Sequence, residues 1–181
     1  KVAQLGGFLN AATSSEFTCY YITLPADHAK DAVLMLDDML RNPLFPEDKF
    51  LSEREVILRE LAMYKDSPMQ NLYEHILQET FRVHPIRLPA AGFKDKLETV
   101  TRECMADYHL RRYTPGRTSF VVVGDVNPDS MLELVRKQTA DWKRGCLNEP
   151  VIPAEPACSF QRKSRFEFPH PLACCSSSWQ T

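Results

Sequence analysis

The chain has 181 residues, of which 44% are apolar and 25% are charged, and its formal net charge is -2. These values are typical of a globular protein of one-domain size, and the near balance of charge argues against a nucleic-acid partner. No apolar run approaches the roughly 20 residues that a membrane-spanning helix needs, so we expect no membrane insertion.

The first part of the chain predicts a β-hairpin followed by helices. Strand-forming residues over 8–13 and 17–24 flank a polar turn at 14–16, which is typical of a hairpin. Apolar residues at helical spacing then predict a helix over 27–41, which an Asn-Pro pair ends. A second helix begins near residue 46.

The middle of the chain predicts two more helices and a buried strand. A Ser-Pro pair interrupts the helical pattern before a third helix over 71–81, and a proline-bearing loop over 84–93 follows it. A fourth helix covers about 102–113. Residues 118–126, TSFVVVGDV, are almost all apolar, so we expect a central strand that is covered on both faces.

The last part of the chain predicts one helix, a linker and two strands. The helix runs from residue 128 to about 139, and residues 144–162 carry three prolines and no periodicity. Strands are expected near 165–168 and 174–179. Hairpin, helices and strands in this irregular order predict an α+β layered domain, with a mainly antiparallel sheet covered by helices.

Two glutamates of the second helix occupy an unexpected place. On a helical wheel, Glu53 and Glu60 fall inside a broad apolar arc and lie about 20° apart, so both point the same way. A buried carboxylate needs a cation, hydrogen-bond donors or a metal, because its burial is otherwise costly. Either Arg54 and other basic groups neutralise the two glutamates, or they are one metal ligand and an assisting acid.

The histidines do not by themselves indicate a zinc site. A catalytic zinc ion commonly has three protein ligands, often two histidines at i,i+4 on one helix and a glutamate from another. No two of the five histidines have this spacing. The segment NLYEH, residues 71–75, has asparagine where the first ligand of H-x-x-E-H belongs, so His75 is interpreted as a helix-surface or boundary residue.

Asn10 is a polar residue in the middle of an otherwise apolar strand. Its side chain could satisfy backbone groups at a sheet edge, or it could orient a bound peptide. The residues alone favour the structural role.

The six cysteines have no C-x-x-C pair and no regular spacing, so they indicate neither a zinc ribbon nor a redox motif. We interpret them as reduced thiols, which suits a cytoplasmic protein. The chain opens without methionine and stops in a strand-like segment, CCSSSWQT, so we expect a fragment of a longer protein.

Four segments, taken in order, closely resemble the pitrilysin or insulinase-type zinc peptidases. This family, the inverzincins, includes the mitochondrial processing peptidase and many bacterial members. The segments are GGFLNAATSSEFTCYY, SEREVILRE, HPIRLPAAG and YTPGRTSFVVVGDV. Each motif alone is weak, but the ordered set is specific and covers essentially the whole chain.

The resemblance implies roles for the two glutamates. The family's third zinc ligand corresponds to Glu60, and a glutamate that assists catalysis corresponds to Glu53. The family's H-x-x-E-H helix would lie before Lys1, so both histidine ligands and the general-base glutamate are missing from this chain. Two departures, HPIR in place of H-P-Y-G and Arg117 in place of a frequent asparagine, leave the zinc position untouched.

The resemblance also implies how a substrate binds. The strand formed by Asn10, Ala11, Ala12 and Thr13 would be the sheet edge to which an extended peptide or unfolded polypeptide adds. Members of this family close two homologous halves around the substrate. We therefore expect a second half or a partner subunit.

Taken together, the sequence predicts part of a zinc metalloendopeptidase that hydrolyses peptide bonds with a zinc-activated water. Residues 1–143 would be a partial peptidase domain of the mitochondrial processing peptidase-like type, 144–164 a linker, and 165–181 the final strands or the start of the next domain. This fragment alone should hold no catalytic zinc and should be inactive. The alternative is a non-catalytic paralogue or subunit that binds peptides or a partner protein, although a scaffold needs neither Glu53 nor Glu60.

Overall fold

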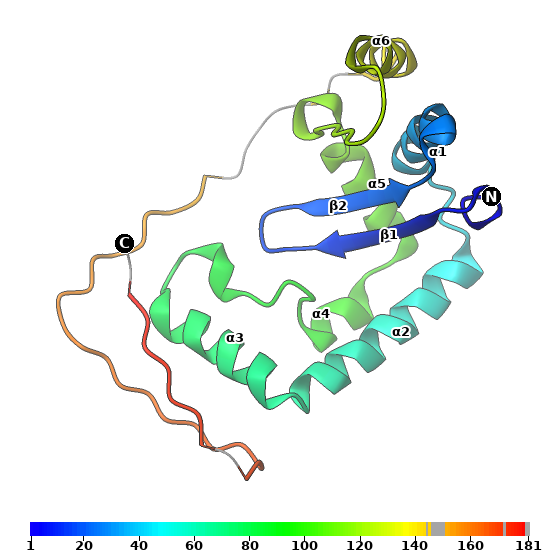
Figure 1. Cartoon of the computed structure of the whole chain (residues 1–181). Coiled ribbons are helices and arrows are strands. Elements are labelled where there is room, and N and C mark those ends of the chain that lie inside the picture. Colours follow the sequence, from blue (N-terminus) through cyan, green and yellow to red (C-terminus); the bar gives the residue numbers. More distant parts are fainter. Residues whose placement is uncertain (144, 146–150, 172, 180–181) are drawn as a thin grey trace. The chain divides into compact units, whose positions relative to one another are not determined.

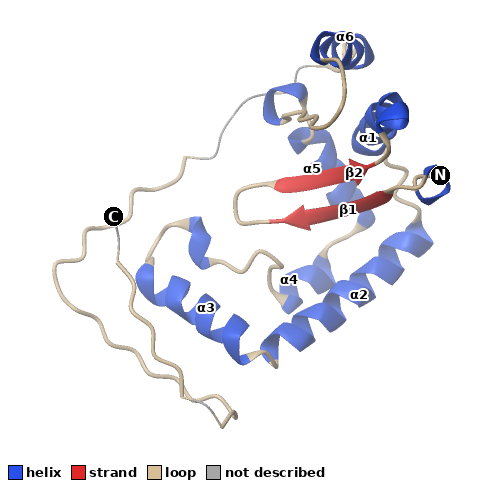
Figure 2. Ribbon diagram, viewed as in Figure 1, coloured by secondary structure: helices blue, strands red, loops and turns tan. Residues whose placement is uncertain are grey.

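The computed structural model describes residues 1–143, 145, 151–171 and 173–179. They belong to two compact units, Lys1–Glu47 with Thr101–Asn148, and Asp48–Val100 with Glu149–Thr181. The described residues contain a two-stranded antiparallel sheet and six α-helices (Figures 1 and 2). The predicted α+β class is therefore confirmed.

The first unit opens with the predicted hairpin. Strand β1 spans Phe8–Thr13 and pairs antiparallel with β2, Thr18–Thr23. The turn is fixed by Ser14, whose backbone N–H donates to the Phe17 carbonyl at 2.8 Å. The Ser14 hydroxyl also accepts from the backbone N–H groups of Glu16 and Phe17. This short polar turn sets the register of the two strands.

Helices complete the first unit. The α-helices are α1 (Ala29–Arg41), α5 (Arg102–Arg112) and α6 (Pro128–Gln138), and the 3-10 helices are η1 (Ala3–Leu5), η2 (Ala26–His28) and η4 (Pro115–Arg117). The Thr101 and Asn127 side chains accept backbone N–H groups at the starts of α5 and α6, as N-caps do. Helix α1 contacts both β2 and α6.

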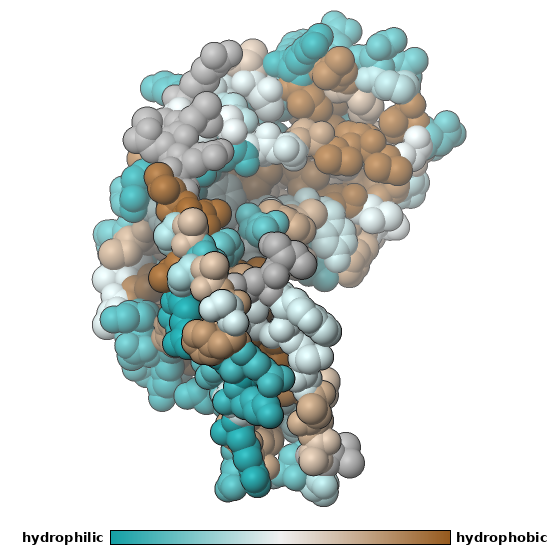
Figure 3. Space-filling model, turned by 90° about the vertical axis from the view of Figure 1, so that its left-hand side faces the viewer, coloured by the Kyte–Doolittle hydropathy of each residue, from teal (hydrophilic) through white to brown (hydrophobic). Residues whose placement is uncertain are grey.

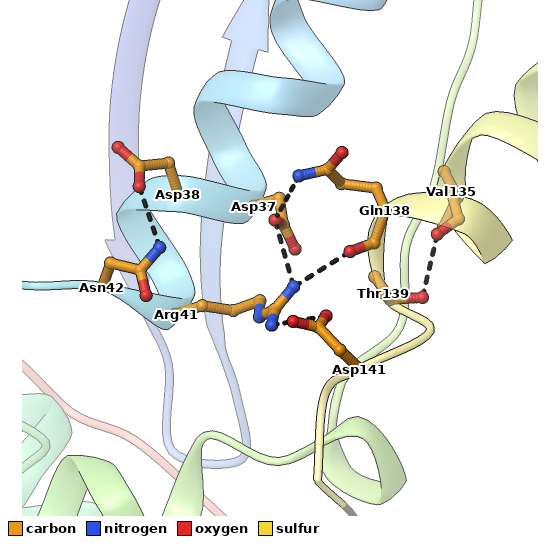
Figure 4. Close-up of polar contacts among 8 residues, drawn as sticks. All are labelled: Asp37, Asp38, Arg41, Asn42, Val135, Gln138, Thr139 and Asp141. Carbon is orange, nitrogen blue, oxygen red and sulfur yellow. Dashed lines mark hydrogen bonds and ion pairs between the residues drawn. The ribbon is translucent and has the colours of Figure 1, made fainter.

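A polar cluster joins α1 to α6 (Figure 4). The guanidinium of Arg41 donates to the Gln138 carbonyl at 2.9 Å and to Asp141 Oδ1 at 2.7 Å. Asp37, which is only 4% exposed, accepts from the Gln138 side chain at 3.0 Å and from Arg41 at 3.4 Å. These contacts fix the end of α6 against α1.

The second unit is built around two consecutive helices. Its elements are α2 (Glu47–Lys65, whose first residue belongs to the first unit), α3 (Pro68–Thr80), η3 (Pro85–Arg87) and α4 (Lys94–Thr99). Ser67 caps α3 by accepting from Gln70, with Pro68 in the first turn, where proline is tolerated. The Asn71 amide donates to the carbonyls of Tyr64, Lys65 and Ser67 and so ties the end of α2 to the start of α3.

Few side chains are deeply buried in the described part of the chain. Val33 of α1, 3% exposed, is the one apolar side chain there that is more than nine-tenths buried. Hydrophobic patches lie at the surface between hydrophilic ones (Figure 3). No helix among the described residues is long and apolar enough to cross a membrane.

The predicted central strand at 118–126 is wrong. This segment makes no ladder, and Val121 and Val123 are 77% and 92% exposed. Residues 120–126 line a cavity of about 230 Å³ together with α1 and residues 22–24. A strand needs a neighbouring strand for its backbone groups, and within the described residues β1 and β2 pair only with each other.

Two further predictions for the last residues are also wrong. Neither 165–168 nor the described residues 174–179 form a strand. The segment that contains them makes side-chain contacts with α3, described below, in place of a backbone ladder. The six-residue helix α4 was not predicted, because it is too short to show a helical period.

Candidate functional site

Glu53 and Glu60 lie on α2, but the prediction that they face a buried side is wrong. Both are exposed. The half-buried stripe of this helix is narrower than the apolar arc of the wheel and consists of Phe50, Arg54, Ile57, Leu58 and Leu61. The acidic flank, which we define as Glu53, Val56, Glu60 and Met63, lies roughly a third of a turn away around the helix. Its two apolar members are 36% and 69% exposed.

The two carboxylates of the acidic flank are two helical turns apart on α2. Seven helical residues place them about 10.5 Å apart along the helix axis and on the same side. Neither has a hydrogen bond or ion pair with a described residue. Arg54 donates to the Val100 carbonyl at 3.4 Å and lies over the Phe50 ring at 5.7 Å. The structure therefore gives no support to neutralisation by Arg54.

The described residues contain no complete metal site. No group of three or more His, Cys, Asp or Glu residues among them could hold a metal ion. His75 is half-buried on α3, with its Nε2 at 2.7 Å from the Ser164 hydroxyl and its ring 4.4 Å from that of Phe166, so its interpretation as a boundary residue is confirmed. Glu60 fits one carboxylate ligand of a zinc ion, not a complete site.

Strand β1 has one open edge among the described residues. All six of its residues are exposed. Because Ser14 and Phe17 form a hydrogen-bonded pair at the turn, the alternation of an antiparallel ladder directs the backbone groups of Leu9, Ala11 and Thr13 outward. This outward row is what an added strand would pair with.

Asn10 engages that open edge directly. Its side-chain Oδ1 accepts the backbone N–H of Ala11 at 2.8 Å, and this N–H is one of the outward groups. The structural role predicted for Asn10, satisfying a backbone group at a sheet edge, is therefore observed. A peptide that added to β1 would have to displace this side chain from Ala11.

The first half of the chain matches a known family. Residues 1–93 match the family model described as Insulinase (Peptidase family M16). The chain belongs to this peptidase family. Residues 99–173 match a second model, described as Peptidase M16 inactive domain. The resemblance drawn from the sequence motifs is thereby confirmed.

Several curated relatives of this insulinase-family chain are named as zinc proteases. An uncharacterized zinc protease of Mycobacterium leprae is 37% identical over 75% of this chain and 31% of its own length. A probable mitochondrial-processing peptidase subunit beta of Arabidopsis thaliana is 30% identical over 76% of this chain and 26% of its own length. The chain spans about a third of the length of the curated relatives that it matches.

Solved structures agree on the fold. A protease from Helicobacter pylori matches with a TM-score of 0.74 and 30% identity, over 86% of this chain and 38% of that one. An M16-like peptidase of Alicyclobacillus acidocaldarius has the same TM-score at 24% identity, over 86% of this chain and 37% of that one. The second likeness shows the fold alone.

Sequence reasoning missed two sets of contacts. In the first, Asp37 and Arg41 are spaced i,i+4 on α1, a signal that could have indicated their pairing. In the second, Arg162 contacts the last residue of α3 and Glu155 contacts the residues that follow it. No local signal points to these contacts, because their partners are backbone groups more than 70 residues away.

Proposed function

We propose that this chain is part of a zinc-dependent metalloendopeptidase, in which Glu60 is a zinc ligand and Glu53 an assisting acid. The acidic flank of α2 carries the proposal. Two carboxylates without a described partner lie on one side of a long helix, between exposed apolar side chains. Such a surface is suited to a covering segment of polypeptide that brings the remaining metal ligands.

Glu60 and Glu53 would have different roles at such a site. A bound zinc ion supplies a Lewis acid for the peptide carbonyl and a water of lowered pKa. Glu60 would hold one coordination position with its carboxylate. Glu53, two turns away on the same side, would position groups around the metal rather than bind it.

The open edge of β1 would receive the substrate. Outward backbone groups at Leu9, Ala11 and Thr13 supply affinity for any extended polypeptide, because they pair with its main chain and not with particular side chains. Ala12 and Asn10 belong to the same strand and complete the proposed binding segment. A second homologous half or a partner subunit would close over this edge.

A non-catalytic subunit is the second candidate. The observation that favours it is the match of residues 99–173 to a model described as an inactive domain. Such a subunit would keep the β1 edge and bind peptides or a partner without hydrolysis. The two glutamates on α2, which have no partner among the described residues, favour the enzyme, because a scaffold has no need of them.

The chain would be divided into three parts. Residues 1–143 would belong to a peptidase domain, 144–164 would form a linker, and 165–181 would end that domain or begin the next. A cytoplasmic location is supported by the exposed thiols of the described cysteines, which suit a reducing compartment.

The test uses the full-length parent protein. Glu60→Gln should lower both zinc content and peptide hydrolysis severely, because a neutral amide is a poor zinc ligand. Glu53→Gln should lower turnover by about 10- to 100-fold and retain more of the metal. Glu55→Gln is the matched control, since Glu55 is an exposed acid on the other side of α2.

Zinc stoichiometry, melting temperature and peptide hydrolysis are measured on the same preparations. A zinc-loaded and fully active Glu60→Gln protein would end the ligand assignment. An unmodified parent that binds peptide but neither holds zinc nor hydrolyses it would establish the non-catalytic candidate.

A further inference from the structure

Three consecutive backbone N–H groups follow helix α3 and converge on one carboxylate. The N–H groups of Arg82, Val83 and His84 all donate to the side chain of Glu155, the latter two at 3.0 and 2.9 Å. Glu155 is half-buried. Successive N–H groups in a bend form a concave surface that favours an anion, and hydrogen bonds to an ionised acceptor are the strong ones.

The electrostatics of Glu155 agree with this geometry. Partial desolvation opposes ionisation, but the three backbone donors and the nearby His84 together hold the pKa of the Glu155 carboxyl below its ordinary value. The site therefore prefers the charged carboxylate. His84 is itself fixed, because its Nδ1 accepts the backbone N–H of Ile86 at 3.1 Å.

A positively charged side chain of the same segment makes a second contact, at the last residue of α3. The Arg162 guanidinium donates to the Thr80 carbonyl at 2.8 Å, at the end of α3 where the helix dipole favours a cation. The segment Val151–Phe166, the orange trace in Figure 1, thus contacts the residues that follow α3 through an acid and the last residue of α3 through a base seven residues later.

Apolar burial contributes little to holding this segment. Val151, Ile152 and Phe160 are 92%, 57% and 69% exposed. The tilted contact between the Phe166 and His75 rings is the one ring contact between the segment and α3 within the described residues. Polar contacts, not a hydrophobic seam, therefore position the segment, and such contacts can be exchanged for those of another ligand.

We propose that the backbone of Arg82–His84 is a carboxylate-binding site, which Glu155 of the same chain occupies and closes. When Glu155 is withdrawn, the site takes a carboxylate from another source. The proposal concerns a surface separate from the acidic flank of α2 and does not rest on the proposed peptidase activity.

Glu155→Ala empties the site, and sodium acetate is the probe. Hydrogen exchange and NMR amide shifts are followed at Arg82, Val83 and His84. Exchange of these amides should quicken roughly tenfold or more in the variant, because each loses a charge-assisted hydrogen bond. Acetate at about 10 to 100 mM should restore protection and shift these amides saturably, whereas sodium chloride at equal ionic strength should not.

Glu167→Ala is the matched control. Glu167 is an exposed acid of the same region, 90% exposed and 3.9 Å from Arg165, so its removal should leave the three amides unchanged with or without acetate. Equal exchange in the Glu155 and Glu167 variants would overturn the proposal. So would an acetate response no larger than that to chloride.

Glu155→Gln separates binding from folding. It keeps the shape of the side chain and removes its charge, and the Phe81 amide, which donates to the Leu77 carbonyl at the end of α3, reports helix integrity. Protection of Phe81 should persist in both Glu155 variants. Its loss in both would show that Glu155 supports the helix itself, which would contradict a separable ligand site.

Discussion

The Arg41 guanidinium holds two carboxylates of very different exposure, so its removal tests the cluster that joins α1 and α6 (Figure 4). Asp37 is 4% exposed and Asp141 is 79% exposed, while Arg41 itself is 17% exposed. Arg41→Met keeps an apolar stem near the Trp142 ring, over which the guanidinium lies at 5.6 Å. It leaves the buried Asp37 carboxylate with only the Gln138 amide as a described donor.

The burial of Asp37 sets the expected change in the free energy of unfolding. Removing one partner of a buried ion pair costs about 3–5 kcal/mol, and the 3.4 Å separation of Arg41 from Asp37 places this pair at or below the lower end. We therefore expect Arg41→Met to lower the free energy of unfolding by about 2–3 kcal/mol. Asp141→Asn, which removes only the exposed partner, should cost about 0–1 kcal/mol.

Urea denaturation followed by tryptophan fluorescence measures both values, because Trp142 adjoins the cluster. A double variant, Asp37→Asn with Arg41→Met, should be less destabilised than the sum of its single variants, by about 1 kcal/mol or more. Equal effects of Arg41→Met and Asp141→Asn, or additivity in the double variant, would refute the reasoning.

Two further predictions concern protonation and metal content. Burial and the 2.7 Å contact with the Tyr20 hydroxyl raise the pKa of the Tyr113 phenol well above its ordinary value. This contribution to stability should be complete below about pH 10, the unfolded value, and should be lost as pH rises above it. Wild type and Tyr113→Phe should therefore gain the same phenolate absorbance between about pH 9 and 11, and a smaller gain in the variant would contradict the shift. This chain alone, carefully desalted, should hold far less than one zinc ion per molecule, because Glu60 supplies one of the three ligands that a catalytic site needs; stoichiometric zinc by elemental analysis would show that other ligands had been overlooked.

Local sequence signals predicted most of the regular elements. The hairpin of β1 and β2 follows from strand-forming residues around a polar turn, and Ser14 fixes that turn through its own neighbours. Helices α1, α5 and α6 begin and end close to their predicted bounds. For α5 and α6, the capping side chains lie within three residues of the backbone groups that they satisfy. The third helix begins earlier than predicted, since Pro68 opens it.

Predictions of strand pairing and of burial, which depend on residues far away in the sequence, were wrong. The valines of residues 118–126 have the composition of a covered strand, but no strand of the described chain pairs with them. The helical wheel of α2 shows a broad apolar arc. The residues of the second unit bury only part of this arc and leave Glu53 and Glu60 exposed. Burial depends on what lies against a helix, and its own period cannot supply that information.

By itself, the sequence determined the family, the α+β class, the hairpin, every α-helix of the described residues except α4, and the spacing that puts two glutamates on one side of α2. These properties depend on residues within a turn or two of one another, or on motifs in fixed order. Only the tertiary structure decided that Arg41 joins α1 to α6 and that Glu155 fills the backbone site at Arg82–His84. Both contacts join groups that are far apart in sequence, so no local pattern specifies them.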